Sequence, residues 1–419
     1  MIDLSSCSVV EAESSLSAHE LQTPLVISSG SVTTLIELTA TVRVTAGGRT
    51  AVGRGSICLS DLWAWPGADR PREAKLAAMI DYGRGIGASL RDRTGGPSHP
   101  LELGLRLHAS VAADHDHPAP MLARSVSASP YDAALHDAVG QLVGRSAFSF
   151  YDEDAAIPSA DRLFPGGTVR AVREALRPPR RELPGWWLIG MTDDLAAVGD
   201  QVRARGFRRF KLKLSGEPAA DAARTVEIFR AAAGWTREPR LSVDTNEASP
   251  DPGAVLAYLE AVERDCPEAY ARLDYLEQPT PRASFEEFDW HPVAARKPVL
   301  LDEGFTGLDQ LEPARARGWS GLALKTCKGH SVALAAAAWA RQRGLLITVQ
   351  DLTNPGLAAI HSHLLAAHLD PINGLELNSP QYMPAANAAW LPRLSGLFAV
   401  RDGRHRLDPT TLTGLGSTL

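Results

Sequence analysis

The sequence predicts an α/β protein in which a closed barrel of parallel strands is joined to a smaller α+β domain. Eight short apolar runs alternate with helical segments between residues 186 and 377. Repeated strand–helix units are typical of a parallel sheet, and eight of them favour a closed barrel over an open sheet. The 419 residues exceed one ordinary domain. A barrel of roughly 250 residues therefore leaves room for a second, smaller unit.

The smaller α+β unit is predicted ahead of the barrel. Residues 32–58 carry β-branched residues in alternation on both sides of a Gly-Gly pair, which predicts two strands joined by a tight turn. Residues 68–92 follow with a helical pattern. Ser129 and Pro130 predict the start of another helix, because serine caps helix N-termini and proline fits in the first turn.

Three segments follow from this organisation. We expect an α+β capping domain in residues 1–125 and the barrel domain in residues 126–380. Residues 381–419 are expected to return to the capping domain. No long low-complexity linker separates these segments, so the connections between them are expected to be ordered.

The barrel elements are predicted from the alternation of apolar runs and helical patterns. The expected strands are 186–190, 209–214, 241–243, 273–276, 299–301, 321–324, 345–349 and 372–377. The clearest helical patterns between them are 219–233, 253–265, 330–343 and 356–368.

Composition excludes several classes of function. The net charge is −6, and basic and acidic residues are mixed along the chain. The chain has no basic patch with interleaved aromatic residues, so nucleic-acid binding is not predicted. No apolar run is long enough to span a membrane, and the N-terminus lacks the pattern of a signal peptide. The four cysteines are scattered and match no metal-ligand spacing, which predicts reduced thiols in a cytoplasmic protein.

Lysines are scarce in this chain and occupy distinctive positions. Only six of the 43 basic residues are lysines, and four of them fall in two short clusters. Lysine can lose its proton near neutral pH when its neighbours lower its pKa, whereas arginine cannot. Lys211 and Lys213 alternate with apolar residues and so point to one face of a strand, while Lys325 ends another apolar run. We predict Lys213 and Lys325 as bases and Lys211 as an electrostatic helper.

Three carboxylates at the ends of successive apolar runs are the candidate metal ligands. Asp244, Glu277 and Asp302 are 33 and 25 residues apart, each about one strand–helix unit. The C-terminal ends of barrel strands line the active site, and three carboxylates there suit Mg²⁺ with positions left open for water and substrate. A single strand-end carboxylate can instead cap a helix or pair with arginine. Three in successive units, flanked by lysines, predict a metal-assisted proton transfer on an acid.

Other polar residues beside the strands are less specific. Lys328 could bind a substrate anion, or it could simply cap or face water, and we favour the second interpretation. Asp351 could orient a polar substrate group or hydrogen-bond a lysine, and the functional and structural interpretations both stay open. His361 and His363 cannot share one face of a helix, so we do not predict a metal site there.

The ordered set of motifs resembles the enolase superfamily, in particular its muconate lactonizing enzyme subgroup. Those motifs, in chain order, are Lys-x-Lys at 211–213, Asp-x-Asn at 244–246, Glu-Gln-Pro at 277–279, Asp-Glu at 302–303 and Lys325. The segment 129–140 also resembles the helix that leads such proteins into their barrel. A lysine at 325 differs from the His-Asp dyad of the mandelate racemase subgroup.

The resemblance implies a modified TIM barrel of seven strand–helix units and a final strand, (β/α)7β, with an α+β capping domain built from both termini. It assigns Mg²⁺ binding to Asp244, Glu277 and Asp302, and acid/base catalysis to Lys213 and Lys325. A small-molecule carboxylic acid is the implied substrate. A homo-oligomer is implied by analogy with relatives.

Substrate binding or support of the site is expected from Asn246, Glu303 and Asp351. The last strand reads Glu376-Leu-Asn378, where the dipeptide epimerases similar to this subgroup show Asp-x-Asp. This departure argues against dipeptide substrates.

Specificity in such proteins comes from capping loops, which we place at residues 17–31 and 59–67. The second loop carries Trp63 and Trp65. These tryptophans could close an apolar lid over a substrate or pack at the domain interface, and the sequence leaves both possibilities open.

The predicted reaction removes the proton α to a carboxylate and forms an enediolate. Two opposed lysines allow racemisation or epimerisation, and equally cycloisomerisation or syn-elimination. A Schiff-base aldolase with a lysine nucleophile is an alternative that needs no metal. A catalytically silent barrel is the second alternative.

Overall fold

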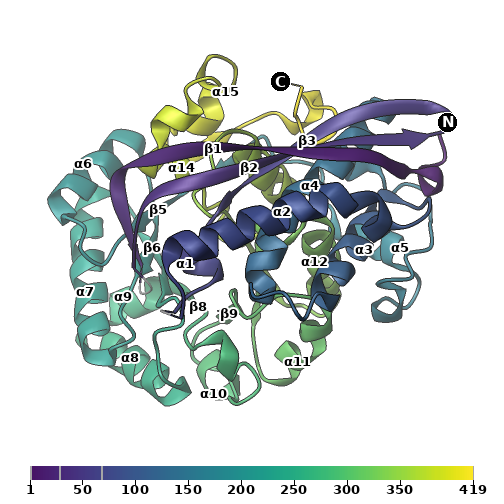
Figure 1. Cartoon of the computed structure of the whole chain (residues 1–419). Helices are drawn as coiled ribbons and strands as arrows, with labels where there is room; N and C mark the ends of the chain where they lie inside the picture. Colours follow the sequence, from purple (N-terminus) through teal and green to yellow (C-terminus); the bar gives the residue numbers. More distant parts are fainter. Residues whose placement is uncertain (1, 28–29, 68, 419) are drawn as a thin grey trace.

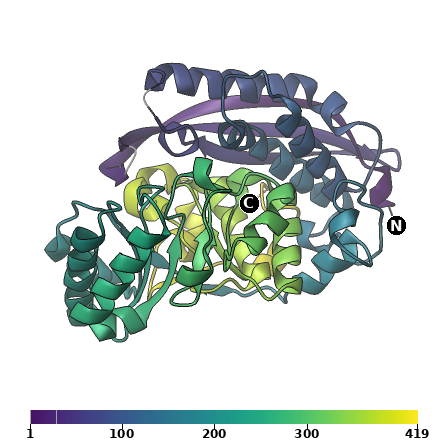
Figure 2. The ribbon, with the colours of Figure 1, turned by 90° about the horizontal axis from the view of Figure 1, so that it is seen from below.

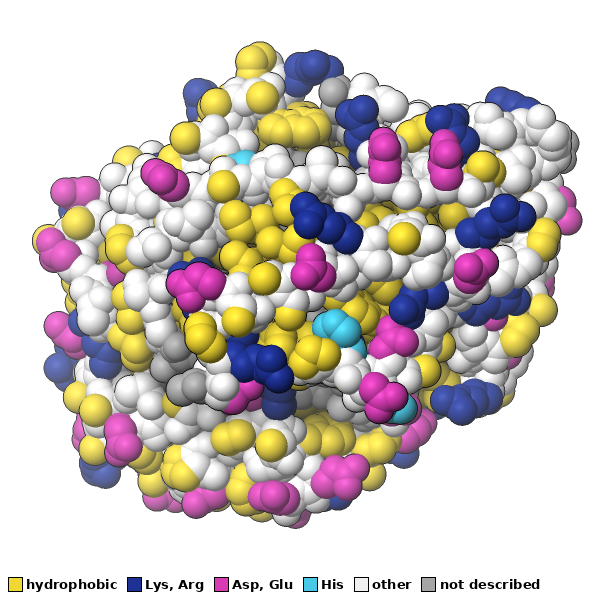
Figure 3. Space-filling model, viewed as in Figure 1, with side chains coloured by type: hydrophobic (Ala, Val, Ile, Leu, Met, Phe, Trp, Pro, Cys, Tyr) yellow, Lys and Arg dark blue, Asp and Glu magenta, His cyan; other side chains and the backbone are white. Residues whose placement is uncertain are grey.

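The computed structural model describes residues 2–27, 30–67 and 69–418. A barrel built from the middle and later parts of the chain is covered on one side by an N-terminal sheet and its helices (Figures 1 and 2). Lys/Arg and Asp/Glu side chains are interspersed over the face that Figure 3 shows. No helix in the described part of the chain is long and apolar enough to cross a membrane.

An antiparallel sheet of three strands forms the covering layer. Its strands, in spatial and chain order, are β1 (Ser8–Ile27), β2 (Gly30–Ala46) and β3 (Arg49–Leu59). The expected hairpin of β2 and β3 is confirmed, with Gly47 and Gly48 at φ of 55° and 73° in its tight turn. The first strand was not predicted, because its Ser/Glu-rich sequence mostly faces solvent and carries only a weak apolar alternation.

Two long helices, α2 (Arg72–Thr94) and α4 (Met121–Val143), pack on this sheet. A third, α3 (Pro100–Ala113), packs on these two helices, and the short α1 (Asp61–Ala64) precedes all three. The helix expected over 68–92 is therefore confirmed. The division of the chain at residue 125 remains a prediction, and α4 continues across that point.

The prediction that a helix starts at Ser129 is wrong, because α4 begins eight residues earlier and contains Pro130 in its interior. Proline has no N–H to donate to the carbonyl of Val126, four residues before it. The Ser129 hydroxyl donates to that carbonyl instead, at 2.9 Å. This replacement bond lets the helix continue through the proline.

Seven parallel strands form the curled barrel sheet, in the order β11-β10-β9-β8-β7-β6-β5. The strands are β5 (Trp186–Ile189), β6 (Arg209–Lys213), β7 (Arg240–Asp244), β8 (Leu273–Glu277), β9 (Val299–Leu301), β10 (Gly321–Lys325) and β11 (Leu346–Gln350). Helices alternate with them, namely α6 (Leu195–Arg205), α7 (Pro218–Trp235), α8 (Pro252–Asp265), α9 (Pro267–Arg272), α10 (His291–Ala294), α11 (Leu311–Ala316), α12 (His330–Gln342) and α13 (Gly356–Leu369). The predicted strand–helix rhythm is confirmed over these units.

The eighth predicted run, 372–377, is not a regular strand. Asn373 and Gly374 have positive φ angles of 62° and 86°, which break an extended conformation. Only Leu375 forms bridges, one to Gly185 and one to Val349. These two partners lie beside β5 and on β11, so a single residue links the two edges of the sheet.

The C-terminal segment packs on both parts of the molecule. The strand β12 (Arg404–Arg406) pairs with β4 (Glu182–Pro184) just before the barrel. The backbone N–H of Leu415 donates to Asp137 of α4 at 2.8 Å. The remaining helices are α5 (Thr168–Ala175), α14 (Ser379–Tyr382) and α15 (Leu391–Phe398).

Two close approaches make glycine necessary where β3 lies on α4. A Cβ atom at Gly53 would stand 2.1 Å from the backbone nitrogen of Ala138, and one at Gly55 would stand 2.2 Å from the carbonyl oxygen of Pro130. Backbone atoms cannot move aside as the end of a flexible side chain can. The sheet therefore lies on the helix at a distance that only glycine allows.

We expect Gly53→Ala to lower the free energy of unfolding by at least about 2 kcal/mol, because it forces β3 away from α4. Gly85→Ala is the matched control, since its Cβ meets nothing within 4 Å on the exposed face of α2. That change should stabilise the protein by about 0.5–1 kcal/mol through helix propensity. Urea denaturation of both variants measures the difference, and equal stability of the two would contradict this packing.

Several histidines are buried as neutral groups. Burial lowers the pKa of His361 and His363 to about 3, and that of His99 and His405 to about 4. Neither ring nitrogen of His363 has a hydrogen-bond partner within the described residues. Protonation of these rings in the folded state is therefore unfavourable.

We expect these four histidines to lower the stability as the pH drops below about 6.5, the histidine pKa of the unfolded chain. Below that value each of them binds more protons in the unfolded state than in the folded state. Each of the four histidines then removes about 1.4 kcal/mol per pH unit until the folded-state pKa is reached. Urea denaturation at pH 7, 6 and 5 measures this slope, and His363→Leu should reduce it. The same slope in the variant would refute the contribution of His363.

Candidate active site

The carboxyl ends of the barrel strands bring the predicted site residues together. In the sheet register, Lys213 pairs with Asp244, and Asp244 pairs with Glu277, at the ends of β6, β7 and β8. Asp302 follows β9 directly, and Lys325 ends β10. All five side chains are at most 8% exposed. The sequence thus placed them correctly at one end of the barrel.

Lys211 lies at the centre of a buried lysine–carboxylate cluster. Its Nζ donates to Glu277 at 2.7 Å and to Glu376 at 3.1 Å, and lies 3.1 Å from Asp244. It also donates to the side-chain oxygen of Gln350 at 3.3 Å. Burial by itself lowers the pKa of Lys211, but Glu277 and the other carboxylates outweigh it and raise that pKa well above its usual value.

The two predicted bases each contact a predicted metal ligand. Lys213 donates to Asp244 and Lys325 donates to Asp302, both at 2.6 Å. Although burial lowers the pKa of Lys325, Asp302 and Glu277 raise it above its ordinary value. In this arrangement Lys325 carries a proton.

Lys328 also belongs to the cluster. Its Nζ donates to the carbonyl oxygen of Asp302 at 2.6 Å and to the Asp302 carboxylate at 2.9 Å. The side chain is 3% exposed. Lys328 therefore does not face water, but its bond to the Asp302 carbonyl agrees with the capping role that the favoured interpretation also included. It follows β10 in a 3₁₀ turn (Thr326–Lys328), which directs it back over the strand ends.

The carboxylates of this cluster differ in their affinity for protons. Burial alone raises the pKa of Asp244, Glu277 and Asp302. For Asp244, Lys213 and Lys211 outweigh burial and lower the pKa to about 2. For Glu277, burial and the neighbouring carboxylates prevail over Lys211 and raise the pKa to about 7. Two lysines hold the pKa of Asp302 well below its usual range.

Glu303 and Asn246 extend the cluster toward the cap. Asn246 donates through its amide to Glu303 at 3.0 Å and through its backbone N–H to Asp244 at 2.8 Å. The indole N–H of Trp63 in α1 donates to the same Glu303 oxygen at 2.8 Å. Burial, followed by repulsion from Asp302 and Asp244, raises the pKa of Glu303 to about 8.

Asp351 mainly orders the loop after β11. Its carboxylate accepts backbone N–H groups from Thr353, Asn354 and Asn378 at 3.0, 3.1 and 3.3 Å. Burial, together with Glu376, raises its pKa to about 7. Asn354 in this loop accepts the backbone N–H of Cys58 in β3 at 2.8 Å, which ties the cap to the barrel.

A cavity of about 50 Å³ lies between the lysines and the cap. Its barrel side includes Lys211, Lys213 and Lys325. Its cap side is apolar and includes Leu25, Ile27, Val32, Leu35 and Trp63.

Both expected capping segments reach this region. The first, 17–31, is not a loop as expected: its residues 17–27 lie in β1 and 30–31 at the start of β2, while residues 28–29 are outside the described part. In the second, Trp63 lines the cavity with its ring 4.6 Å from the Lys325 ammonium. Trp65 is buried in the cap, where its carbonyl accepts Lys75 at 3.0 Å. One tryptophan therefore faces the site and the other packs within the cap.

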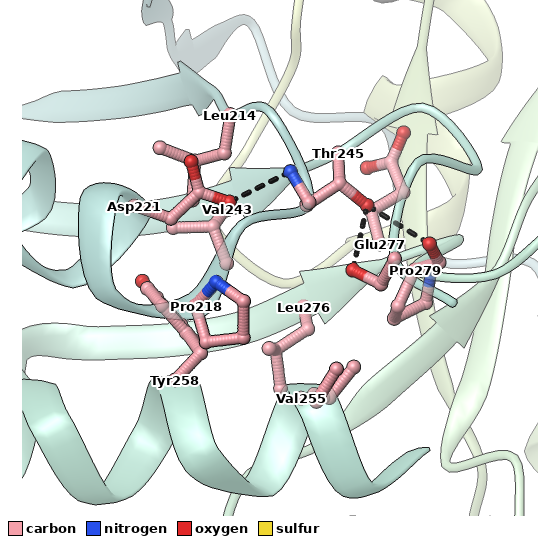
Figure 4. A pocket seen from close by; sticks show the side chains of 13 residues that line it. Leu214, Pro218, Asp221, Val243, Thr245, Val255, Tyr258, Leu276, Glu277 and Pro279 are labelled. Atoms are coloured by element: carbon pink, nitrogen blue, oxygen red, sulfur yellow. Dashed lines mark hydrogen bonds between the residues drawn. The ribbon is translucent and has the colours of Figure 1, made fainter. Parts of the chain in front are cut away.

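Another cavity, of about 20 Å³, lies behind the sheet between β6–β8 and helices α7 and α8 (Figure 4). Its walls are mostly apolar, and its polar groups bond to one another, as Thr245 does to the carbonyl of Pro279 at 3.0 Å. This volume holds about one water molecule. It is a packing space and not a substrate site.

The donor set fits a hard divalent cation in its chemistry. Asp244, Glu277 and Asp302 present carboxylate oxygens, the ligand type that Mg²⁺ and Ca²⁺ prefer, at three adjacent strand ends, and each is at most 1% exposed. Four buried lysines face five buried carboxylates, which leaves one formal negative charge (Lys211, Lys213, Lys325, Lys328; Asp244, Glu277, Asp302, Glu303, Glu376). Among the described residues, no three His, Cys, Asp or Glu side chains already stand as a metal cluster. Lysine ammonium groups lie between the carboxylates here.

Glu376 and Gln350 are site residues that the sequence places at strand ends but to which it assigns no role. Both follow apolar runs, as the predicted ligands do, and that position was the available signal. Their contact with Lys211 depends on the curvature of the sheet, which brings β11 and the following segment round to β6.

A family model described as enolase C-terminal domain-like matches residues 194–419. A comparison with curated protein sequences finds no match. Solved structures match over nearly the whole chain at low identity, and this likeness concerns the fold.

One similar structure is a dipeptide epimerase from Enterococcus faecalis V583, complexed with Mg and the dipeptide L-Leu-L-Tyr. It has 16% identity and a TM-score of 0.68, over 98% of this chain and 99% of that chain. The muconate lactonizing enzyme from Pseudomonas fluorescens, complexed with muconolactone, has 18% identity and a TM-score of 0.64, over 98% and 96%. The N-succinyl Arg/Lys racemase from Bacillus cereus ATCC 14579 has 14% identity and a TM-score of 0.67, over 98% and 95%.

Proposed function

The chain belongs to the enolase C-terminal domain-like family, and from this premise we propose that it is a Mg²⁺-dependent enzyme that removes the proton α to a carboxylate. The observation that carries the proposal is the placement of Lys213 and Lys325 on one cavity beside the carboxylates of β7, β8 and the β9 end. The Mg complex of a similar epimerase supports the choice of metal.

Asp244, Glu277 and Asp302 would hold the cation. When bound, it supplies Lewis-acid stabilisation of negative charge on the carboxylate oxygens of a substrate. The lysines that contact these carboxylates in the structure must then turn toward the cavity.

Lys213 and Lys325 approach the cavity from different sides. Three strands, β7, β8 and β9, lie between β6 and β10 in the sheet order. One neutral lysine can take a proton at Nζ while the other, still protonated, faces the opposite side of the substrate. This arrangement serves racemisation or epimerisation, and it serves cycloisomerisation or syn-elimination equally. Lys211, held by three carboxylates, supplies positive charge beside the base.

The cavity favours a carboxylic acid with an apolar body. The cap contributes aliphatic side chains and the face of Trp63. Glu376 bonds to Lys211 and accepts the amide of Asn378 at 2.8 Å, so its oxygens are engaged within the protein. This supports the expectation that dipeptides, whose free amino group requires an acidic partner, are not the substrates. The expected homo-oligomeric state remains a prediction.

We expect the wild-type protein to bind Mg²⁺ stoichiometrically and Asp244→Asn to lose at least about tenfold in affinity, because a charged oxygen ligand is removed. Glu376→Gln is the matched control, since it changes a carboxylate of the same cluster that is not a proposed ligand. Isothermal titration calorimetry measures both. Equal loss in the two variants would show that net charge, and not ligation, governs binding.

We expect Lys213→Ala and Lys325→Ala each to reduce turnover by about 10²–10⁴-fold, as loss of a general acid or base does. Solvent deuterium entering the α-carbon of apolar carboxylic acids, read by NMR, measures the proton transfer. Lys297→Ala is the control, because that lysine lies before β9 at the far end of the barrel. Full activity of either variant would refute the two-base assignment. Borohydride trapping of a substrate on either lysine would indicate Schiff-base chemistry instead.

A further inference from the structure

A second concave site lies at the opposite end of the barrel from the lysine–carboxylate cluster. Strands β6 and β7 begin at Arg209 and Arg240 and end at Lys213 and Asp244. A five-residue strand spans about 13 Å, so the two ends are distinct places. A cavity of about 380 Å³ lies at the end of the barrel where these strands begin. Six arginines line it, namely Arg208, Arg209, Arg237, Arg240, Arg272 and Arg404.

Positive charge is in excess around this cavity. Only two acidic residues, Glu238 and Asp402, line it with the six arginines. Asp402 and the nearby Glu182 are also engaged by Arg406, at 3.4 and 2.9 Å. Arg272 is 3.6 Å from Glu238.

Three of the arginines have no acidic partner. Within the described residues, no carboxylate lies within 4.0 Å of Arg208, Arg209 or Arg237. Among the residues that the structure describes, the Arg209 side chain donates to the neutral side chain of Asn373, at 3.3 Å. Burial, followed by repulsion from Arg404 and other arginines, lowers the pKa of Arg209. An anion placed among these guanidinium groups would relieve that repulsion.

The wall of the cavity is held in place by the backbone. The segment before β12 packs against the turn before β6, where Gly403 donates to the carbonyl of Arg205 and accepts from Gly185, both at 2.8 Å. A Cβ atom at Gly403 would stand 2.5 Å from the carbonyl oxygen of Gly206. Two segments almost 200 residues apart in the chain are thereby fixed side by side, and they carry Arg208, Arg209 and Arg404.

We propose that this arginine-lined cavity binds a small ligand that carries two or more phosphate charges. Guanidinium groups match phosphate oxygens with paired, charge-assisted hydrogen bonds. The volume lies in the range of small-molecule sites, about 300–1,000 Å³, and the turn before β12 forms one wall of the cavity with Asp402, Gly403 and Arg404. The site is independent of the proposed catalytic function.

The test is calorimetric titration of the full-length protein with inorganic pyrophosphate, at low salt and with EDTA present to remove divalent metal. We expect saturable binding to the wild type, weakened at least about tenfold in the double variant Arg209→Gln/Arg237→Gln because charge-assisted hydrogen bonds are lost. The control, Arg84→Gln/Arg91→Gln, removes the same charge from α2 of the cap and should bind as the wild type does. Thermal denaturation checks that both double variants are folded.

Absence of pyrophosphate binding to the wild type would overturn the proposal, as would equal binding by the Arg209/Arg237 variant. Orthophosphate binding as tight as pyrophosphate would show a general anion surface and contradict a multiply phosphorylated ligand. Tighter binding of a single-stranded oligonucleotide would overturn the small-ligand class. Asp244→Asn should bind pyrophosphate as tightly as the wild type does. The outcome of this test therefore does not depend on whether Asp244 is a metal ligand.

Discussion

The buried ion pairs at the carboxyl ends of the barrel strands are the constraint on which the rest of the site depends. Four lysines and five carboxylates lose their water there, and each must find its partner within the protein. Breaking one buried pair typically costs about 3–5 kcal/mol, whereas apolar residues of similar volume are often as stable or more so. Stability alone therefore does not explain the cluster. Its composition fits a site that accepts a divalent cation and exchanges protons with a bound acid.

The cap completes this site and does not merely cover it. Trp63 bonds to Glu303 and lies over Lys325, while β3 is bonded to the loop after β11 through Asn354. Binding and release of a substrate must therefore disturb contacts between cap and barrel. In the proposed function, the apolar cap residues contact the body of a substrate and the charged strand ends bind its carboxylate.

Sequence patterns predicted the location of a side chain best where a residue type suited to the proposed chemistry also stands at the end of an apolar strand. Asp244, Glu277 and Lys213 each end an apolar strand, and the barrel geometry then requires that they meet. Lys328 could not be assigned in this way, because its burial depends on a 3₁₀ turn that folds it back over Asp302. The early start of α4 was missed because Ser129 compensates for a proline through a hydrogen bond that no periodicity reveals. The eighth strand was overpredicted, because within the apolar run 372–377 only Leu375 forms β-bridges to the two edges of the sheet.

The most direct measurement is a crystal structure of the protein grown with Mg²⁺ at neutral pH. The account predicts a cation about 2.0–2.1 Å from oxygens of Asp244, Glu277 and Asp302. It also predicts that the ammonium groups of Lys213 and Lys325 have left their 2.6 Å contacts and point into the cavity. Lysines that keep these contacts, with no cation among the three carboxylates, would contradict the proposed metal-assisted proton transfer.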